Sequence, residues 1–507
     1  MNVLFRADAS AVIGTGHVMR CLTLADLLRE DGVDCRFACR EIPPLFKKLI
    51  GDAGHGVEIL PRRSRDAAAK GKTAAHTEWL QASWQDDAAD TARIVEERDI
   101  NRVVVDHYAL DVRWEDAITA QGVRIAVIDD LADRRHNCDI LVDHNLRNEP
   151  QNRYRDLTPE ACHLLLGPRY ALLRPEFQRA RRAGRRFAGK ARHFLVAFGG
   201  IDAANLTSLT LDAVEQIVPP GASIDIAIGA EHARRPELET RCREGGWRLH
   251  VQTDSMAQLM AAADIAVGAG GGMVWERAAT GLPSIAIPVA ENQREQVANA
   301  ACHGLLRVVE PVGLSGLELS RHIADLAEDS VLRERMSKAC LATVDGLGAR
   351  RVARQINPPA FDFRFAEASD SADLYRWRND EAIRRHARDP KPIGWDEHER
   401  WLATTLADPS RRLLIARDSG GPLGVVRFDK SGNRAEISIY LVPARLGEGL
   451  GSALLAAAEA WLARDSREVE SIRAEIVSGN LASEQLFGSS GYSKEGPLYV
   501  KKIGIRK

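Results

Sequence analysis

A histidine beside two glycines near the N-terminus is the first group in the chain with the chemistry of a catalyst. Residues 14–20 read Gly-Thr-Gly-His-Val-Met-Arg and place His17 at the start of a predicted helix. Glycines let the backbone approach a ligand, and amides at a helix start favour an anion. An imidazole titrates near neutral pH and can accept a proton there. The run therefore predicts proton transfer beside an anion, as in chemistry on a phosphorylated substrate.

Acidic and aromatic residues follow a second apolar segment. Asp106, His107 and Tyr108 come directly after the valines at 103–105. Strand ends of parallel sheets are where α/β proteins bind ligands, so these side chains are expected near His17. An alternative is that Asp106 and His107 form a structural pair at the end of the strand.

A third loop is rich in glycine and opens a predicted helix. Residues 268–273 read Gly-Ala-Gly-Gly-Gly-Met, and their backbone amides suit a diphosphate. Glu276, one turn into the helix, could accept hydrogen bonds from ribose hydroxyls. Asn292 and Gln293 follow the next apolar strand. A glycine run before a helix is often only a tight turn, so the prediction depends on the combination of these loops.

The last third of the chain carries a glycine-rich turn of its own. Gly447, Gly449 and Gly451 alternate after an apolar strand that ends at Val442, and a helix is predicted to follow. Successive exposed amides at a helix start suit a pyrophosphate.

The elements that must position these loops fall into three groups. Short β-branched runs alternate with helical stretches in two similar series, which is typical of buried parallel strands. Two doubly wound halves in series place a cleft between the carboxyl ends of their sheets. Pro358 and Pro359 interrupt the pattern, and antiparallel-looking strands follow. The sequence predicts an α/β protein with halves over 1–185 and 190–355, a linker over 356–361 and a last domain over 362–507.

Composition narrows the class of protein. The 507 residues carry a net charge of -2, which gives no reason to expect a nucleic-acid partner. The eight cysteines are scattered without a CxxC pair, so reduced thiols are expected, and no zinc site. The N-terminus does not read as a signal peptide, and Asp264 and glycines break the most apolar stretch, 261–274. We expect a cytoplasmic enzyme for small molecules, with no membrane span and no metal.

Jointly, the loops of the first two halves resemble the pseudaminic-acid-pathway UDP-sugar hydrolases. The resemblance covers about residues 1–355 and lies in the runs 6–10, 14–21, 106–108, 129–130, 143–146, 198–202, 205–207, 270–276 and 291–293. It implies a GT-B fold and hydrolysis of UDP-2,4-diacetamido-2,4,6-trideoxy-β-L-altropyranose to the free sugar and UDP. One departure is Gly272, where family members often carry Ser. The expected substrate contacts are Gly16, Arg20, Asp106, Tyr108, Gly270, Gly271, Gly272, Met273, Glu276, Asn292 and Gln293.

The resemblance also implies a catalytic role for His17. Neutral His17 would deprotonate a water that attacks the anomeric carbon while UDP leaves. Amides that hold the charge of the diphosphate make it a good leaving group, so no metal is strictly needed. Direct displacement by water predicts inversion at that carbon.

The last domain resembles the GNAT N-acetyltransferases, which implies acetyl-CoA as co-substrate. The family usually has Arg or Gln where Leu446 stands, and neighbouring Arg445 is a candidate to replace that contact. Many members have a tyrosine, proposed as general acid, at the position of Phe487. Phenylalanine cannot donate a proton, so that role is vacant or moves, with Tyr492 and Tyr499 as candidates. The expected cofactor contacts are Leu441, Val442, Gly447, Gly449, Leu450, Gly451, Ser452 and Asn480.

The acceptor of the acetyl group is the most open question. Residues 377–380 resemble both the amino-sugar acetyltransferases of the pseudaminic pathway and the ribosomal-protein acetyltransferases. Acetylation of the 4-amino group is the step just before hydrolysis, so the fusion favours a bifunctional enzyme in which Arg378 and Asn379 contact the UDP-sugar. His386 or Glu436 would deprotonate the ammonium. The alternatives are a GT-B glycosyltransferase, a hydrolysing UDP-sugar 2-epimerase, and a last domain that only senses CoA or acetylates proteins.

Overall fold

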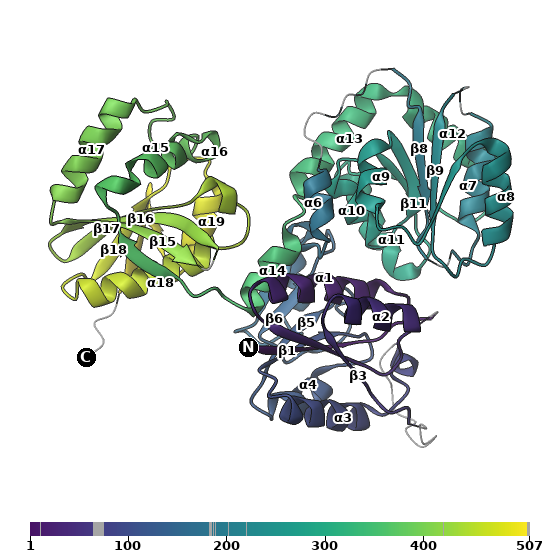
Figure 1. Ribbon diagram of the computed structural model, residues 1–507, viewed down its shortest axis with the longest axis horizontal. Coiled ribbons are helices and arrows are strands. Elements are labelled where there is room, and N and C mark those ends of the chain that lie inside the picture. Colours follow the sequence, from purple (N-terminus) through teal and green to yellow (C-terminus); the bar gives the residue numbers. More distant parts are fainter. Residues whose placement is uncertain are drawn as a thin grey trace. The chain divides into compact units, whose positions relative to one another are not determined.

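The protein divides into two compact units, Met1–Ile356 and Asn357–Lys507. The computed structural model describes residues 1–10, 12–63, 76–181, 185, 187, 189–200, 202–217, 219, 221–418 and 420–503. Within the first unit, two parallel sheets each lie between layers of helices (Figure 1).

The first sheet has the strand order β3-β2-β1-β4-β5-β6-β7, and all its strands are parallel. The strands are β1 Asn2–Ala7, β2 Asp34–Cys39, β3 Gly56–Ile59, β4 Arg102–Asp106, β5 Arg124–Ile128, β6 Ile140–Asp143 and β7 His163–Leu166. The helices are α1 Gly16–Glu30, α2 Pro44–Asp52, α3 Trp84–Glu97, α4 Val112–Thr119, α5 Pro150–Tyr154 and α6 Pro175–Ala180. Strand β1, which lies between β2 and β4, is enclosed on both faces, and Val3, Leu4 and Phe5 are fully buried.

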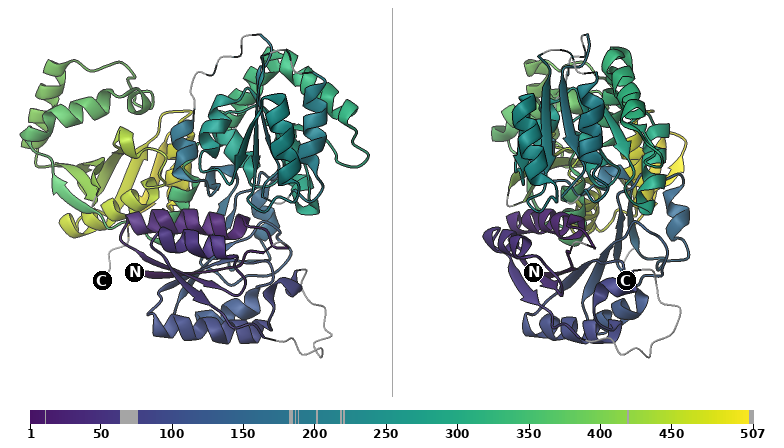
Figure 2. Two further views of the ribbon diagram at one scale, coloured as in Figure 1. Left: turned by 45° about the vertical axis from the view of Figure 1, so that its right-hand side comes forward. Right: turned by 90° about the vertical axis from the view of Figure 1, so that its right-hand side faces the viewer.

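Helices α1 and α2 cover one face of this sheet, and α3 and α4 cover the other, as Figure 2 also shows. Burial on both faces explains why the strands read as continuous β-branched runs. The order places the ends of β1 and β4 side by side, so the loops after these strands share one edge of the sheet.

The second sheet repeats this plan with the order β10-β9-β8-β11-β12-β13. Its strands are β8 His193–Ala197, β9 Ser223–Ile228, β10 Arg248–Val251, β11 Ile265–Ala269, β12 Ser284–Ile287 and β13 Arg307–Val308. Its helices are α7 Leu206–Glu215, α8 Arg235–Gly245, α9 Met256–Ala262, α10 Met273–Ala279, α11 Glu291–Cys302, α12 Gly316–Glu328 and α13 Ser330–Thr343. The prediction of doubly wound α/β halves is confirmed.

The last helix of the first unit returns to the first sheet. Helix α14, Gly348–Ile356, follows the second series in the chain, yet Val352 and Ile356 are fully buried in the core beneath α1. The end of the first unit is thereby packed into the core of the first sheet.

The second unit is built on a mixed sheet with the order β14-β15-β16-β17-β18-β20-β19. Helices α15 and α17 pack on one face, and α18 packs on the other (Figure 1). The strands are β14 Asp362–Phe365, β15 Arg411–Asp418, β16 Gly421–Ser431, β17 Arg434–Leu441, β18 Ser471–Glu475, β19 Ser493–Glu495 and β20 Leu498–Lys502. The helices are α15 Ser371–Asn379, α16 Glu381–Arg384, α17 Trp395–Ala407, α18 Gly451–Asp465 and α19 Leu481–Ser489.

Candidate active sites

A buried carboxylate connects His17 and Arg20 at the edge of the first sheet. Asp106 ends β4, and its Oδ1 lies 2.6 Å from Nδ1 of His17 in the first turn of α1. The Arg20 guanidinium donates to both oxygens of Asp106, at 2.5 and 2.6 Å. Burial alone would raise the pKa of Asp106, but the Arg20 and His17 charges hold it well below its ordinary value. Asp106 is therefore an ionised group that orients the imidazole.

Tyr108 and Asp130 extend this cluster along the same edge. The Tyr108 hydroxyl donates to Oδ1 of Asp130 at 2.5 Å, and Arg20 lies 3.7 Å from the other oxygen of Asp130. The ring of Tyr108 meets His17 edge-on, with 4.8 Å between ring centroids. The structure thus brings together the predicted residues Arg20, Asp106 and Tyr108 around His17.

Two aromatic residues that the sequence analysis missed complete the surroundings of His17. Trp79 lies 6.3 Å from His17 and 5.5 Å from Tyr108, centroid to centroid, and His76 lies 4.4 Å from Trp79. Both belong to a segment around the short 3₁₀ helix Thr77–Leu80, which follows no predicted strand end. No motif or spacing in the sequence marks them.

The glycine turn of the second half connects β11 to α10 and is braced by α11. A side chain at Gly270 would lie 2.6 Å from Val297 of α11, whereas Gly272 faces open space. Gln296 donates to the Gly270 carbonyl at 3.2 Å. Gln293 accepts from the Val289 amide at 3.0 Å. A serine would fit at Gly272, so the departure from the hydrolase pattern leaves the turn itself intact.

The Glu276 carboxylate is available to accept hydrogen bonds. It is partly buried in α10, and no hydrogen-bond partner of its carboxylate is found among the described residues. Burial raises the pKa of Glu276, with Arg174 and Arg277 opposing that effect. The predicted contact Asn292 is exposed in the first turn of α11. Ile201, in the motif at 198–202, lies outside the described residues.

Helix α11 also contacts the first half of the same unit. Glu295 forms an ion pair with Arg147, and the Asn299 amide donates to the Leu146 carbonyl at 3.1 Å. The helix that braces the glycine turn is thereby tied to the segment that follows β6.

In the second unit, strands β17 and β18 separate soon after they meet. They pair only at residues 434–436 of β17, and among the described residues no strand covers 437–441 on that side. Backbone N–H and C=O groups of residues 437–441 are therefore available on that side to form hydrogen bonds with an extended ligand. Just beyond lie Gly447 and Gly449, which adopt left-handed φ angles of 82° and 78° before α18 begins at Gly451. The remaining predicted cofactor contacts lie along the same path, from Leu441 and Val442 to Leu450 and Ser452.

Two side chains that were candidates for cofactor contacts are already engaged within the protein. The Arg445 guanidinium pairs with Asp418 at 2.7 Å and with Glu448 at 3.0 Å, so it is bound to carboxylates and not free to replace a contact at Leu446. Asn480 caps α19 by accepting from the Ser483 amide at 3.2 Å.

The aromatic residues around Phe487 form a packed group. Phe487 is buried, and its ring lies 4.9 Å from that of Tyr492, centroid to centroid. The Tyr492 hydroxyl donates to Glu459 at 2.8 Å, and burial beside Glu459 raises the pKa of Tyr492. Tyr492 is thus a structural hydrogen-bond donor in this structure.

The two residues predicted to contact the acetyl acceptor differ in their surroundings. Asn379 donates to the Ile393 carbonyl at 3.1 Å and accepts from the Ile393 amide at 2.8 Å, which holds the loop before α17. Arg378 reaches only the Asp389 carbonyl, at 3.4 Å, and its buried Nη1 has no partner among the described residues. Of the pair, Arg378 has the spare hydrogen-bonding capacity. Glu436 is held by Arg388 and Arg473 at 3.2 and 3.0 Å.

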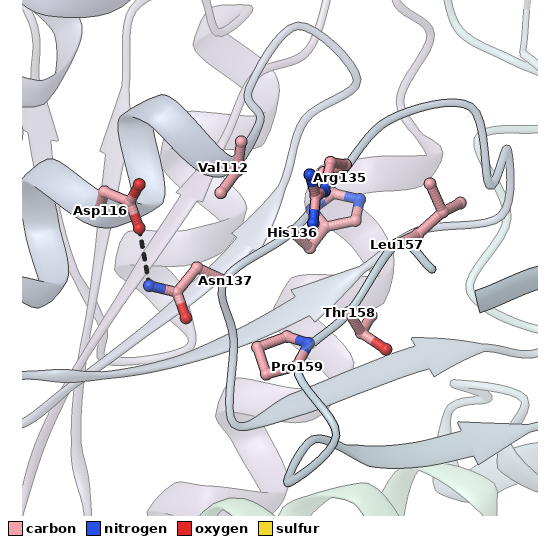
Figure 3. A pocket seen from close by; sticks show the side chains of 8 residues that line it. All are labelled: Val112, Asp116, Arg135, His136, Asn137, Leu157, Thr158 and Pro159. Atoms are coloured by element: carbon pink, nitrogen blue, oxygen red, sulfur yellow. Dashed lines mark hydrogen bonds between the residues drawn. The ribbon is translucent and has the colours of Figure 1, made fainter. Parts of the chain in front are cut away.

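A hollow of about 290 Å³ lies beside α4. Asn137 donates to Asp116 across it at 2.7 Å, as Figure 3 shows. It is lined by Val112, Asp116, Arg135, His136, Asn137, Leu157, Thr158 and Pro159. None of these is a predicted site residue, and the His136 imidazole is already bound to Glu115 at 2.7 Å.

The described part of the chain contains no helix long and apolar enough to cross a membrane. It also contains no group of three or more His, Cys, Asp or Glu side chains placed to hold a metal ion.

Each of the two units contains a segment that matches a known protein family. Residues 203–351 match the glycosyltransferase family 28 C-terminal domain, and residues 361–493 match the acetyltransferase (GNAT) domain. The UDP-2,4-diacetamido-2,4,6-trideoxy-β-L-altropyranose hydrolase of Campylobacter jejuni is 28% identical over 262 residues, which are 51% of this chain and 81% of that protein. An uncharacterized protein of Methanocaldococcus jannaschii is 21% identical over 512 residues, 97% of each chain. Among solved structures, MurG of Acinetobacter baumannii is 14% identical, with a TM-score of 0.49 over 70% of this chain and 98% of its own.

The two matched domain families and the two parallel sheets confirm the predicted architecture. The chain is a fusion of a GT-B-like unit, homologous in part to a UDP-sugar hydrolase, with a C-terminal GNAT acetyltransferase domain.

Proposed function

We propose that the chain is a bifunctional nucleotide-sugar enzyme. Its GNAT domain acetylates the 4-amino group of a UDP-sugar with acetyl-CoA, and its first unit then hydrolyses UDP-2,4-diacetamido-2,4,6-trideoxy-β-L-altropyranose to the free sugar and UDP. The observation that carries the hydrolysis is the hydrogen bond between His17 and the buried carboxylate of Asp106. The partial homology to the Campylobacter jejuni hydrolase supports the substrate.

The pairing with Asp106 makes His17 a base at its other nitrogen. An ionised carboxylate at Nδ1 favours the tautomer that carries its proton there, which leaves the lone pair of Nε2 for water. That water attacks the anomeric carbon, the bond from this carbon to the UDP oxygen breaks, and the water proton passes to Nε2. The sugar product has the inverted configuration.

UDP would lie on the second half. Backbone amides of residues 270–273 face the diphosphate, and Glu276 accepts hydrogen bonds from the ribose hydroxyls. Its unpartnered carboxylate supports this assignment. Because α11 both braces the glycine turn and contacts the first half, UDP bound there would present its sugar to the His17 edge.

Acetyl-CoA would lie where β17 and β18 separate. The extended pantetheine arm pairs with the open edge of β17, and the pyrophosphate meets the amides of residues 447–452. The amine of the sugar attacks the thioester carbon, the nitrogen loses a proton to solvent, and the bond to the CoA sulfur breaks. Phe487 cannot protonate the leaving thiolate, so solvent supplies that proton.

The test uses the full chain with acetyl-CoA and the UDP-4-amino sugar. Mass spectrometry should show a gain of one acetyl group and then release of UDP, and NMR of the new sugar should show inversion. His17→Ala should accumulate the acetylated UDP-sugar with acetyl transfer unchanged. Retained anomeric configuration, or normal UDP release by His17→Ala, would overturn the proposed mechanism.

Transfer of the sugar to an acceptor other than water is the second candidate. The match of residues 203–351 to a glycosyltransferase C-terminal domain favours it. If the sugar leaves only when a hydroxyl-bearing acceptor is added, the first unit is a glycosyltransferase and not a hydrolase.

A further inference from the structure

The segment that follows β6 contains two buried polar groups that no partner satisfies. His144 and Asn145 are 6% and 2% exposed, and neither Nδ1 of His144 nor Oδ1 of Asn145 has a hydrogen-bond partner among the described residues. A buried polar atom without a partner costs about 1–3 kcal/mol, and native structures contain few of them. Other unpartnered buried atoms occur in the described part of the chain, but these two lie on adjacent residues at one strand end, where a ligand can supply the missing partners.

These two residues lie on the same sheet edge as the His17 cluster. Strand β6 pairs with β5 in the sheet, and β5 pairs with β4, so residue 144 follows the strand end next to Asp130. The charges of Arg20 and Asp130 act on the His144 imidazole. On the other side, the next residue, Leu146, accepts the Asn299 amide of α11. The unpartnered atoms therefore lie between the proposed base and the helix that braces the proposed UDP site.

The chemistry of this place favours a neutral ligand. The Arg20 charge is matched by Asp106 and Asp130, and the neighbouring Arg147 is paired with Glu295, so both of these cations already face carboxylates. Burial lowers the pKa of His144 to about 4, which leaves the imidazole neutral at physiological pH. The spare capacity is a carbonyl oxygen on Asn145 and an imidazole nitrogen on His144. Such a pair complements the N–H and C=O groups of a secondary amide.

We infer that His144 and Asn145 form a sugar subsite that recognises an acetamido group of the hexose, with Oδ1 of Asn145 accepting the acetamido N–H. The inference rests on the proposed function, because the residues it names would bind the sugar that the proposed hydrolysis releases. The subsite would also select for acetamido sugars. A sugar without the acetamido group would leave the buried acceptor of Asn145 unpaired and would bind less tightly.

The test compares Asn145→Ala and His144→Ala with the unchanged full chain. UDP release from the diacetamido UDP-sugar should fall at least about tenfold in kcat/KM for Asn145→Ala, the effect of one buried neutral hydrogen bond. UDP affinity, measured by calorimetry, should stay within about twofold, because UDP binds the other half. His163→Ala, an exposed residue at the start of β7, is the matched control and should change neither quantity. Unchanged kcat/KM in Asn145→Ala, or a parallel loss of UDP affinity, would overturn the inference.

A separate binding measurement distinguishes this inference from the proposed function. If the unchanged chain releases no UDP, the proposed hydrolysis is wrong, and the subsite is then judged by saturation-transfer NMR with the free diacetamido sugar in the presence of UDP. Transfer to its acetamido methyl groups in the unchanged chain but not in Asn145→Ala supports the subsite. Equal signals in both proteins, or none in either, overturn it.

Discussion

Oδ1 of Asp106 accepts a hydrogen bond from Nδ1 of His17 at 2.6 Å, although 89 residues separate the two in the chain. Asp106 is fully buried, and Arg20 engages both of its oxygens. The sequence predicts that Asp106 contacts substrate directly, and that stays a prediction. Both carboxylate oxygens already face donors of the protein, so we propose that Asp106 positions the imidazole and that Arg20 keeps Asp106 ionised.

Asp106→Asn should lower the kcat of UDP release at least about a hundredfold and leave acetyl transfer unchanged. The amide would present a donor to Arg20 and no longer stabilise the imidazolium that forms at His17. Loss of one partner from a buried ion pair should also cost about 3–5 kcal/mol in the free energy of unfolding of the first unit. Asp99→Asn, on the surface, is the control. Normal UDP release by a folded Asp106→Asn protein would contradict the positioning role.

Glu276→Gln should weaken UDP binding about tenfold, because hydrogen bonds to a charged acceptor contribute about 1.5–3 kcal/mol. The measurement is calorimetric titration with UDP and, in parallel, with inorganic diphosphate, which has no ribose. Diphosphate affinity should not fall, since Glu276 is assigned to the ribose. An equal loss for both ligands would show that the substitution disturbs the glycine turn instead.

Asp143→Asn should remove a pH dependence of stability. Burial, aided by Asp130, raises the pKa of Asp143 to about 7, so the folded protein keeps a proton that the unfolded chain releases near pH 4. The stability of the unchanged protein therefore falls as the pH rises from about 4 to about 7 and stays lower above that. The carbonyl oxygen of asparagine can accept from the backbone amide of Asn145, and the Tyr154 hydroxyl keeps a second acceptor in the Asp129 carbonyl.

The measurement for Asp143→Asn is thermal or denaturant unfolding across that pH range. The variant should match the unchanged protein near pH 4 and exceed it by up to about 4 kcal/mol at pH 8. Asp156→Asn, which alters an exposed carboxylate, should follow the unchanged protein throughout. A constant difference at all pH values would mean that Asp143 is already ionised in the folded state.

Gly449→Val should abolish acetyl transfer and spare UDP release. A β-branched residue strongly disfavours the left-handed φ of 78° at this position, so the turn that is assigned to the pyrophosphate must rearrange. Acetyl-CoA affinity, followed by fluorescence or calorimetry, should fall at least about tenfold. Gly432→Val imposes similar strain on the hairpin between β16 and β17, and acetyl-CoA affinity should survive it. If both variants bind equally well, the turn does not hold the cofactor.

Tyr492→Phe should leave acetyl transfer within about twofold and lower the free energy of unfolding by about 1 kcal/mol, the contribution of its hydrogen bond to Glu459. Tyr499→Phe is the matched substitution on the neighbouring strand. A large loss of kcat in Tyr492→Phe, together with the loss of the alkaline limb of the pH profile, would assign the vacant acid role to Tyr492.

Local patterns in the sequence determined the architecture. The β-branched runs of both halves are buried parallel strands, because a strand enclosed on two faces needs apolar side chains at every position. Gly447 and Gly449 mark a turn that only residues tolerant of positive φ adopt readily. The order of the loops also predicted His17 as the catalytic base, since helix starts and strand ends at one sheet edge collect functional groups.

Tertiary structure alone decided which side chains are partners. That Arg445 binds Asp418, that Trp79 lies near His17, and that α14 returns to the first core are consequences of how distant segments meet. That His144 and Asn145 have buried polar atoms without a hydrogen-bond partner among the described residues also depends on the tertiary structure. Periodicity reports whether a residue faces a core or solvent, because it depends on a few neighbours in the chain. The choice of a hydrogen-bond partner depends on strand order and on which loops share an edge, which no local pattern encodes.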